Sequence, residues 1–248
     1  MMNFRLSFLI ASFVLVFSGF IGVPALRTNM ENHSPRVTIS LPANNGTFAW
    51  NSTIRYKITV TDLEDGNSDY NEIAGNEVLL KVLYVPDASK TEQYLSAMAN
   101  ENSERPGLTL LKSSDCLNCH AAKNKLIGPS FGLIAEKYPY SSGAVNALTK
   151  KVINGTSGIW GDTPMPAHPM LKTAEARQII EWILKNNLNP DLSFLPGTEG
   201  VLRTKEMPRN EKRQAAYILV ASYMDHGLPG SVGVRKYGQQ AVLLKSSY

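Results

Sequence analysis

The chain has 248 residues, of which 43% are hydrophobic and 19% charged, and its formal net charge is +4 at pH 7. This composition is ordinary for a globular protein, and the length allows one or two domains. The mild positive charge, without a dense Lys/Arg stripe interleaved with aromatic residues, argues against a nucleic-acid-binding protein.

The N-terminal segment has the pattern of an export signal. Arg5 is followed by no charged residue until Arg27, and the run between them is apolar. Small residues near the end of the run favour cleavage after Ala25, so we expect residues 1–25 to be a signal peptide. The run is also long enough to span a bilayer, so an uncleaved N-terminal anchor is the alternative. In both cases we expect the rest of the chain in the periplasm or elsewhere outside the cytoplasm.

Residues 35–103 have the period-two pattern of β-strands. Apolar and polar residues alternate over 37–41, 53–62 and 76–86, and turn-rich polar stretches separate these runs. The pattern predicts half-buried antiparallel strands. The opening, PRVTISLPANNGTFAWNSTIRYKITVTDLEDG, resembles Ig-like or PKD-like modules of exported bacterial proteins, and such a likeness of fold says little about function.

An acidic stretch of this β segment places Asp65, Asn67 and Asp69 at alternate positions, as at the start of an EF-hand loop. Position six of that loop would be Tyr70 instead of glycine, and position twelve would be Asn76 instead of glutamate. We therefore expect a solvated turn here, with calcium binding as the open alternative.

The two cysteines of the chain are three positions apart, at Cys116 and Cys119, and His120 follows them directly. A disulfide between them would close a very small loop and stabilise little. A zinc site needs four ligands, and the other histidines are scattered along the chain. A thioredoxin-like pair would need a βαβ setting. The remaining interpretation is C-x-x-C-H, the attachment sequence of c-type haem, so we expect one covalently bound haem c.

The spacing of these residues suits that cofactor. Three residues of helix make about one turn, so both thiols reach the vinyl groups along one side of a porphyrin. The imidazole of His120 then points at the iron as an axial ligand. A second ligand is expected downstream in GIWGDTPMPAHPML, which contains Met165, His168 and Met170. Met165 lies between two prolines, which stiffen the loop around a soft sulfur ligand.

These motifs together make residues 104–190 resemble a small class I cytochrome c of the bacterial type. The resemblance rests on CLNCH, on the Gly-Pro of the following IGPS, and on the Trp-Gly and Pro-Met-Pro of GIWGDTPMP. It covers about a third of the chain.

The resemblance assigns a role to several residues. It implies that the ring of His120 donates a hydrogen bond to the carbonyl of Pro129. It also implies that Met165 is the sulfur ligand of the iron and that Trp160 lies beside a haem propionate. The His and second Met of AHPML depart from the family pattern, and both remain alternative ligands.

Two amphipathic helices are predicted in the second half of this segment. The stretch GAVNALTKKVINGTSG has a regular apolar face and is closed by Gly155. The stretch TAEARQIIEWILKNN begins at Thr173 and has a broader apolar stripe. Asn189 and Pro190 then end the second helix.

The period-two pattern returns after these helices, over 215–225 and 240–248. Neither end of the chain supplies the roughly seven strands of a β-sandwich, but the two ends together nearly do. We therefore expect an α+β multidomain protein, in which an all-α cytochrome c domain (104–190) is inserted into an antiparallel β-sandwich made by 35–103 and 191–248. The alternative is a cytochrome c domain flanked by a front sandwich and a separate rear hairpin.

The expected function is electron transfer by a single haem c with His/Met axial ligation, without enzymatic activity. Residues 37–103 carry 4 basic and 9 acidic side chains, whereas 104–190 have a modest basic excess. A basic rim suits an acidic redox partner such as a dehydrogenase or a respiratory complex, and ordinary solubility explains the same charge excess equally well. Two alternatives remain: a haem-relay and docking subunit of such a complex, or a haem enzyme or gas sensor with an open axial position.

Overall fold

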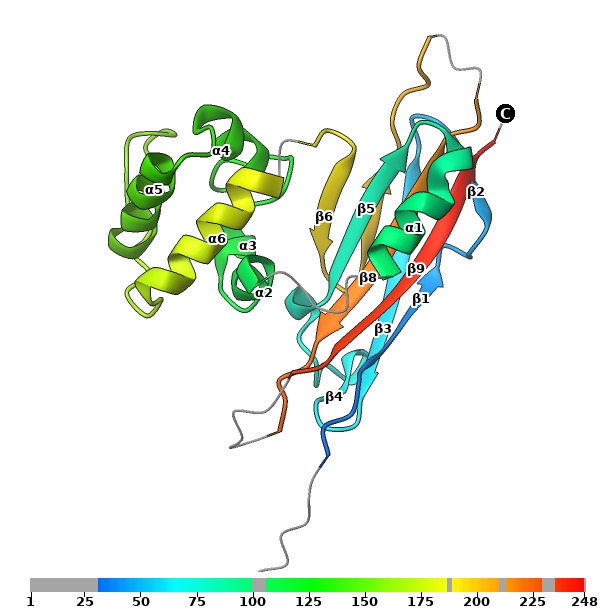
Figure 1. Cartoon of the computed structure of the whole chain (residues 1–248), viewed down its shortest axis with the longest axis horizontal. Helices are drawn as coiled ribbons and strands as arrows, with labels where there is room; N and C mark the ends of the chain where they lie inside the picture. The colour runs from blue at the N-terminus through cyan, green and yellow to red at the C-terminus, as the bar shows by residue number, and fades with distance from the viewer. Residues whose placement is uncertain (1–30, 100–105, 187–188, 210–212, 229–234, 248) are drawn as a thin grey trace, which may run out of the picture. The chain divides into compact units, whose positions relative to one another are not determined.

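The computed structural model describes residues 31–99, 106–186, 189–209, 213–228 and 235–247. The signal peptide or anchor expected over residues 1–25 lies outside these ranges. Within them, the helices α2 to α6 follow one another along the chain, and strands precede and follow them (Figure 1). This is the expected α+β multidomain organisation. No helix in the described ranges has the length and apolar character needed to cross a membrane.

The first sheet combines strands from both sides of the helical segment. Strand β3 (Thr53–Asp62) is its centre and pairs antiparallel with β1 (Arg36–Leu41), with β4 (Gly66–Asn67) and with β7 (Glu199–Arg203). The register places Ile58 opposite Ile39. Strands β1 and β3 were predicted from alternation and are present. The sheet also contains two short strands, β4 and β7, which the alternation did not indicate.

The second sheet has five strands. Their order is β2 (Gly46–Phe48), β9 (Tyr237–Ser246), β8 (Ala216–Met224), β5 (Leu79–Val85) and β6 (Leu192–Pro196). All pairs are antiparallel except β2 with β9, which is parallel. The expectation of purely antiparallel strands is wrong for this pair, because the chain crosses from the first sheet after β1 and enters the second sheet beside β9 in the same direction.

One hydrophobic cluster contains side chains from both sheets. Its most deeply buried members include Ile58, Val60, Leu80, Leu219 and Tyr223, each 0% exposed. Burial of this apolar area is the main stabilising contribution in this part of the chain.

The central strands β5 and β8 are buried on both faces, contrary to the expected half-buried pattern. Their second faces contribute to further clusters, one of which includes Leu95 of helix α1 (Thr91–Ala99). Alternation disappears from a strand when both of its faces are covered, because neither face then needs polar side chains. The segment TEQYLSAMA, which forms α1, was not predicted as a helix.

Five helices form the helical part: α2 (Pro106–Lys112), α3 (Cys116–Cys119), α4 (Phe131–Lys137), α5 (Ser142–Asn154) and α6 (Thr173–Asn186). The two predicted amphipathic helices are α5 and α6, and both bury their apolar stripes in one shared cluster. The hydroxyl of Ser141 caps α5 by accepting from the Ala144 amide at 3.1 Å.

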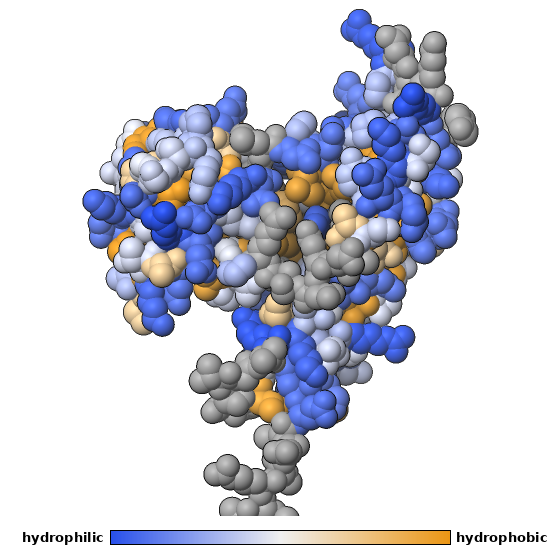
Figure 2. All heavy atoms as spheres, in the orientation of Figure 1, coloured by the Kyte–Doolittle hydropathy of each residue, from blue (hydrophilic) through white to orange (hydrophobic). Residues whose placement is uncertain are grey.

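The helical cluster also receives two side chains from the second sheet. Leu79 of β5 belongs to it, and Phe194 of β6 packs against it. The ring of Phe194 lies 5.0 Å from that of Trp182 in α6, edge to face. Figure 2 shows that hydrophilic residues cover most of the face drawn, with smaller hydrophobic groups between them.

Candidate functional site

The short helix α3 carries both cysteines and ends at His120. The His120 amide donates to the Cys116 carbonyl at 3.0 Å, so the three residues follow one helical turn. Both thiols are free and partly exposed. Burial raises the pKa of the Cys116 thiol, and the hydroxyl of Ser114 lies 3.1 Å from its sulfur. The turn thus places two thiols and an imidazole next to one another.

The ring of His120 is held in one orientation. Its Nδ1 lies 2.6 Å from the Pro129 carbonyl, the hydrogen bond implied by the family resemblance. A carbonyl only accepts, so Nδ1 carries the hydrogen, and in the neutral ring the free lone pair is then on Nε2. Phe131 stacks on the ring at 5.6 Å between centroids. A Cβ on Gly128 would lie 2.4 Å from His120 Cε1, so the backbone approaches the ring as closely as only glycine allows.

Met165 is positioned by its own main chain. Its amide donates to the Thr156 carbonyl at 2.8 Å, and the Thr156 amide donates to the Met165 carbonyl at 3.1 Å. Gly155, which ends α5, has φ +75° and lies so close that a Cβ there would be 2.9 Å from the Met165 carbonyl oxygen. The side chain of Met165 is partly buried against the helical cluster. The loop therefore returns to the end of α5 and brings the thioether toward the core.

The predicted site residues Cys116, Cys119, His120 and Met165 line one cavity of about 220 Å³. The rest of its lining is mostly apolar and aromatic, and includes Tyr138, Leu148, Val152, Trp160, Ile179 and Ile183. A mostly apolar cavity with a few convergent polar groups suits a large planar cofactor. The residues present therefore fit a haem attached at the two cysteines.

The two alternative ligands occupy other environments. The side chain of Met170 is 92% exposed. The imidazole of His168 lies beside a carboxylate, with its Nδ1 3.3 Å from Oδ1 of Asp115. Among the three candidates, Met165 is the one that lines the cavity.

Positive side chains lie around this cavity. Lys125 and Lys151 contribute to its lining. The ammonium group of Lys137 lies 4.6 Å from the ring centroid of Trp160, a cation–π contact with a residue that also lines the cavity. Asp162 also lines the cavity, so the three lysines are accompanied by one aspartate.

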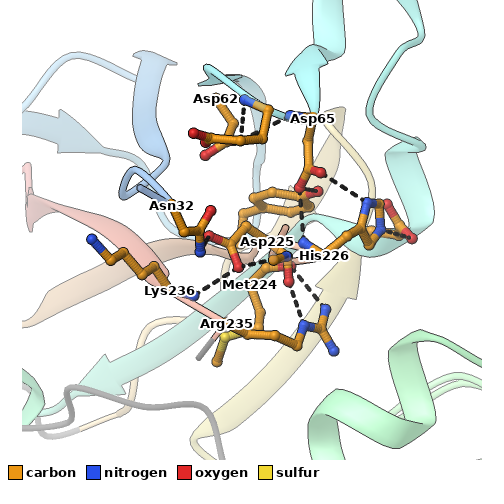
Figure 3. Close-up of polar contacts among 12 residues, drawn as sticks. Asn32, Asp62, Asp65, Met224, Asp225, His226, Arg235 and Lys236 are labelled. Carbon is orange, nitrogen blue, oxygen red and sulfur yellow. Dashed lines mark hydrogen bonds and ion pairs between the residues drawn. The ribbon is translucent and has the colours of Figure 1, made fainter. Parts of the chain in front are cut away.

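The acidic stretch after β3 is held by hydrogen bonds. Asp65 accepts from the Tyr223 hydroxyl at 2.8 Å and from the His226 amide at 2.9 Å (Figure 3). The hydroxyl of Thr59 donates to Asp69 at 3.3 Å. In the described part of the chain, no group of three or more His, Cys, Asp or Glu side chains is arranged to hold a metal ion. The hydrogen-bonded group of Asp65, Tyr223 and His226 was not predicted from the sequence, because Asp65 and His226 are 161 residues apart.

Comparison with known proteins is consistent with this geometry. The profile of the cytochrome c family matches residues 105–187. Cytochrome c-551 of Azotobacter vinelandii is 42% identical over 78 residues, which make up 32% of this chain and 94% of that protein. Cytochrome c-552 of Hydrogenobacter thermophilus is 41% identical over 75 residues, covering 30% of this chain and 76% of that protein. The crystal structure of Nitrosomonas europaea cytochrome c552 has 37% identity, covers 31% of this chain and 94% of that chain, and gives a TM-score of 0.30.

A helical part with C-x-x-C-H at an apolar cavity defines a class of protein that holds haem covalently and transfers electrons. Within that class, the chain belongs to the cytochrome c family, which it matches over 105–187. Its cofactor is therefore covalently bound haem c, and its partners are redox proteins. The resemblance of the β segment to Ig-like or PKD-like modules stays a prediction.

Proposed function

We propose that this chain is an electron carrier in which one haem c is attached through Cys116 and Cys119 and held axially by His120 and Met165. The observation that carries the proposal is that these four side chains, from two separate segments, line the same cavity. Bound there, the haem supplies a one-electron couple at its iron.

The residues of the chain hold both axial positions. The bond from Nδ1 to Pro129 fixes the tautomer of His120 and increases the basicity of Nε2. The Thr156 pairing holds the loop of Met165. With both His120 and Met165 bound, the iron would have no open coordination position, which would favour electron transfer over catalysis, and a methionine would raise the reduction potential relative to a second histidine.

The first test is an absorption spectrum of the exported chain, oxidised and reduced, followed by acid extraction. Haem that stays with the polypeptide after extraction indicates thioether bonds. The expected ligand result is loss of the sulfur-to-iron charge-transfer band in Met165→Ala, with the band kept in the matched variant Met170→Ala. Loss of the band in Met170→Ala alone would contradict the assignment.

We also propose an extracytoplasmic location and an acidic redox partner. Three lysines, Lys125, Lys137 and Lys151, lie beside the cavity and outnumber the one aspartate of its lining, Asp162. Attraction between such a rim and an acidic protein is screened by salt, with a Debye length of about 10 Å at 0.1 M. The rate of electron exchange with an acidic partner should therefore fall as ionic strength rises, as followed by stopped-flow absorbance. An unchanged or rising rate would argue against an acidic partner.

For the β part, we propose a single β-sandwich built from 35–103 and 191–248, with 104–190 inserted between them. In its support, β3 pairs with β7, and β5 pairs with β6 and β8, each pair joining a strand before the helices to one after them. The two sheets also contribute to one hydrophobic cluster.

A second candidate function is that of a haem relay and docking subunit in a larger dehydrogenase or respiratory complex. It is favoured by the size of the β part, since the cytochrome c match leaves most of the chain outside it. Native purification distinguishes the two: a stable complex supports the docking subunit, and a free monomer supports the shuttle. Fast binding of carbon monoxide to the reduced protein would instead favour an open axial position.

A further inference from the structure

The loop that carries Met165 continues to His168, whose main chain is fixed at the end of α5. The His168 amide donates to the carbonyls of Val152 at 3.1 Å and Ile153 at 3.2 Å, in the last turn of that helix. Met165 itself pairs with Thr156. The main chain of the loop is therefore held both at the methionine and three residues beyond it.

The side chain of His168 reaches a different segment of the site. Its Nδ1 lies 3.3 Å from Oδ1 of Asp115, and its side chain is 14% exposed, against 63% for Asp115. Asp115 directly precedes Cys116 and occupies the N-cap position of α3. Aspartate is a favoured N-cap, yet this carboxylate makes no capping hydrogen bond and faces His168 instead.

We propose that His168 is a positioning residue of the haem site. Through Asp115, its imidazole connects the loop of Met165 to the helix that carries both cysteines. The inference rests on the proposed function, with Met165 as the sulfur ligand. A thioether is a weak ligand, so the freedom of its loop decides how readily another ligand displaces it, and a connection to the attachment helix restricts that freedom.

The test uses the full chain loaded with haem and measures imidazole binding to the oxidised protein by loss of the sulfur-to-iron band. Asp115→Asn and His168→Ala should each bind imidazole about threefold more tightly than the unmodified protein, the effect of losing one partly exposed contact between polar side chains. The double variant should equal either single variant, because both act through one contact. Asp115→Glu, which keeps the charge, should restore the original affinity.

A matched control is His33→Gln, because His33 pairs with Glu64 in the β part. It should leave imidazole affinity unchanged. Unchanged affinity in Asp115→Asn and His168→Ala, or additive effects in the double variant, would overturn the inference. Equal urea midpoints in all variants would show that imidazole affinity changes without general destabilisation.

The Met165→Ala variant distinguishes a failure of the role of His168 from a failure of the proposed function. If this variant loses the band while Asp115→Asn binds imidazole as the unmodified protein does, the role of His168 is wrong and the proposed function stands. If Met165→Ala keeps the band, the assignment of Met165 is wrong, and the role of His168 is overturned with it.

Discussion

The orientation of His120 depends on residue 128 being a glycine, because a Cβ at that position would collide with the imidazole ring. The His120 side chain is largely buried, with the residue 9% exposed, and its ring lies between Phe131 and the Gly128 backbone. The same short segment supplies the Pro129 carbonyl that fixes the tautomer. Because residue 128 is glycine, the backbone can approach the imidazole ring. The carbonyl of the next residue, Pro129, then lies within hydrogen-bond distance of Nδ1.

Gly128→Ala is expected to disturb the site. The new Cβ would lie 2.4 Å from His120 Cε1 and 2.8 Å from Nδ1, so the ring or the backbone must move, and we expect this movement to weaken the hydrogen bond to Pro129. Overpacking of this kind costs about 1–3 kcal/mol. Urea unfolding of the haem-loaded chain, together with its reduction potential, measures the effect.

The matched control is Gly143→Ala in the first turn of α5, where a Cβ would meet nothing within 4 Å. Because alanine is the better helix former, this variant should keep or raise the stability by up to about 1 kcal/mol. Similar unfolding midpoints for the two variants would show that the approach of Gly128 to His120 does not matter.

At the scale of elements, His226 connects three parts of the β region. Its Nδ1 lies 3.1 Å from Asp65 in the turn after β3, and its Nε2 lies 3.0 Å from Glu77 in the 3-10 helix η2 (Gly75–Glu77). His226 itself follows β8. Both ring nitrogens can donate only when the imidazole is protonated, so the charged form makes both contacts and the neutral form makes one.

The stability that His226 provides should depend on pH. Burial lowers its pKa, but the hydrogen bond to Glu77 and the charges of Glu77 and Asp65 outweigh burial and raise the pKa overall. A histidine with a raised pKa in the folded state stabilises fully below its unfolded pKa of about 6.5, and this stabilisation is lost as pH rises through the folded pKa.

His226→Gln should therefore lower the free energy of unfolding more at about pH 6 than at about pH 9. The difference should be about 0.5 kcal/mol or less, because the side chain is half exposed and solvent screens the pair. Urea midpoints at both values measure it, and the same substitution in a Glu77→Gln background should show a smaller pH dependence. A loss that is equal at both values, or larger at the higher one, would refute this role.

Prediction from sequence succeeded where a pattern is local. The family resemblance carried by C-x-x-C-H and the following Gly-Pro implied the hydrogen bond of His120 to Pro129, which the structure contains. Alternation predicted strands β1 and β3, whereas β5 and β8 were predicted as strands but are buried on both faces. Strands β6 and β7 were missed because LSFLP and EGVLR are short and lack alternation. The contact of His168 with Asp115 has no local signal, because it forms only when the methionine loop folds back on the cysteine helix.

At the scale of the whole molecule, strands from the two ends of the chain depend on each other. Strand β5 lies between β8 and β6, both of which come after the helices. Strand β2 pairs with β9 alone in its sheet, and β9 is the last strand. The chain segment before the helices therefore has hydrogen-bonding partners for its second sheet only when the rear segment is present.

A chain that ends at residue 190 should lose the β fold and keep the haem spectrum. The truncation removes β6 to β9, leaving β5 and β2 without neighbours in the second sheet. It also removes buried side chains such as Ile218, Leu219 and Leu244. Each large aliphatic side chain contributes roughly 1.5–3 kcal/mol on burial, so the loss of these three alone is comparable with the 5–15 kcal/mol by which a domain is typically stable. Helices α2 to α6 retain most of their shared cluster.

Amide dispersion in a two-dimensional NMR spectrum reports the state of the β part, and visible absorption reports the haem site. The truncated chain should show narrow dispersion for residues 35–103 beside an unchanged visible spectrum. Dispersed strand amides with a cooperative unfolding transition in the truncated chain would show that the front segment folds alone. The cytochrome c domain would then be flanked by separate β parts, as in the alternative architecture, because a front segment that folds alone does not need the rear strands.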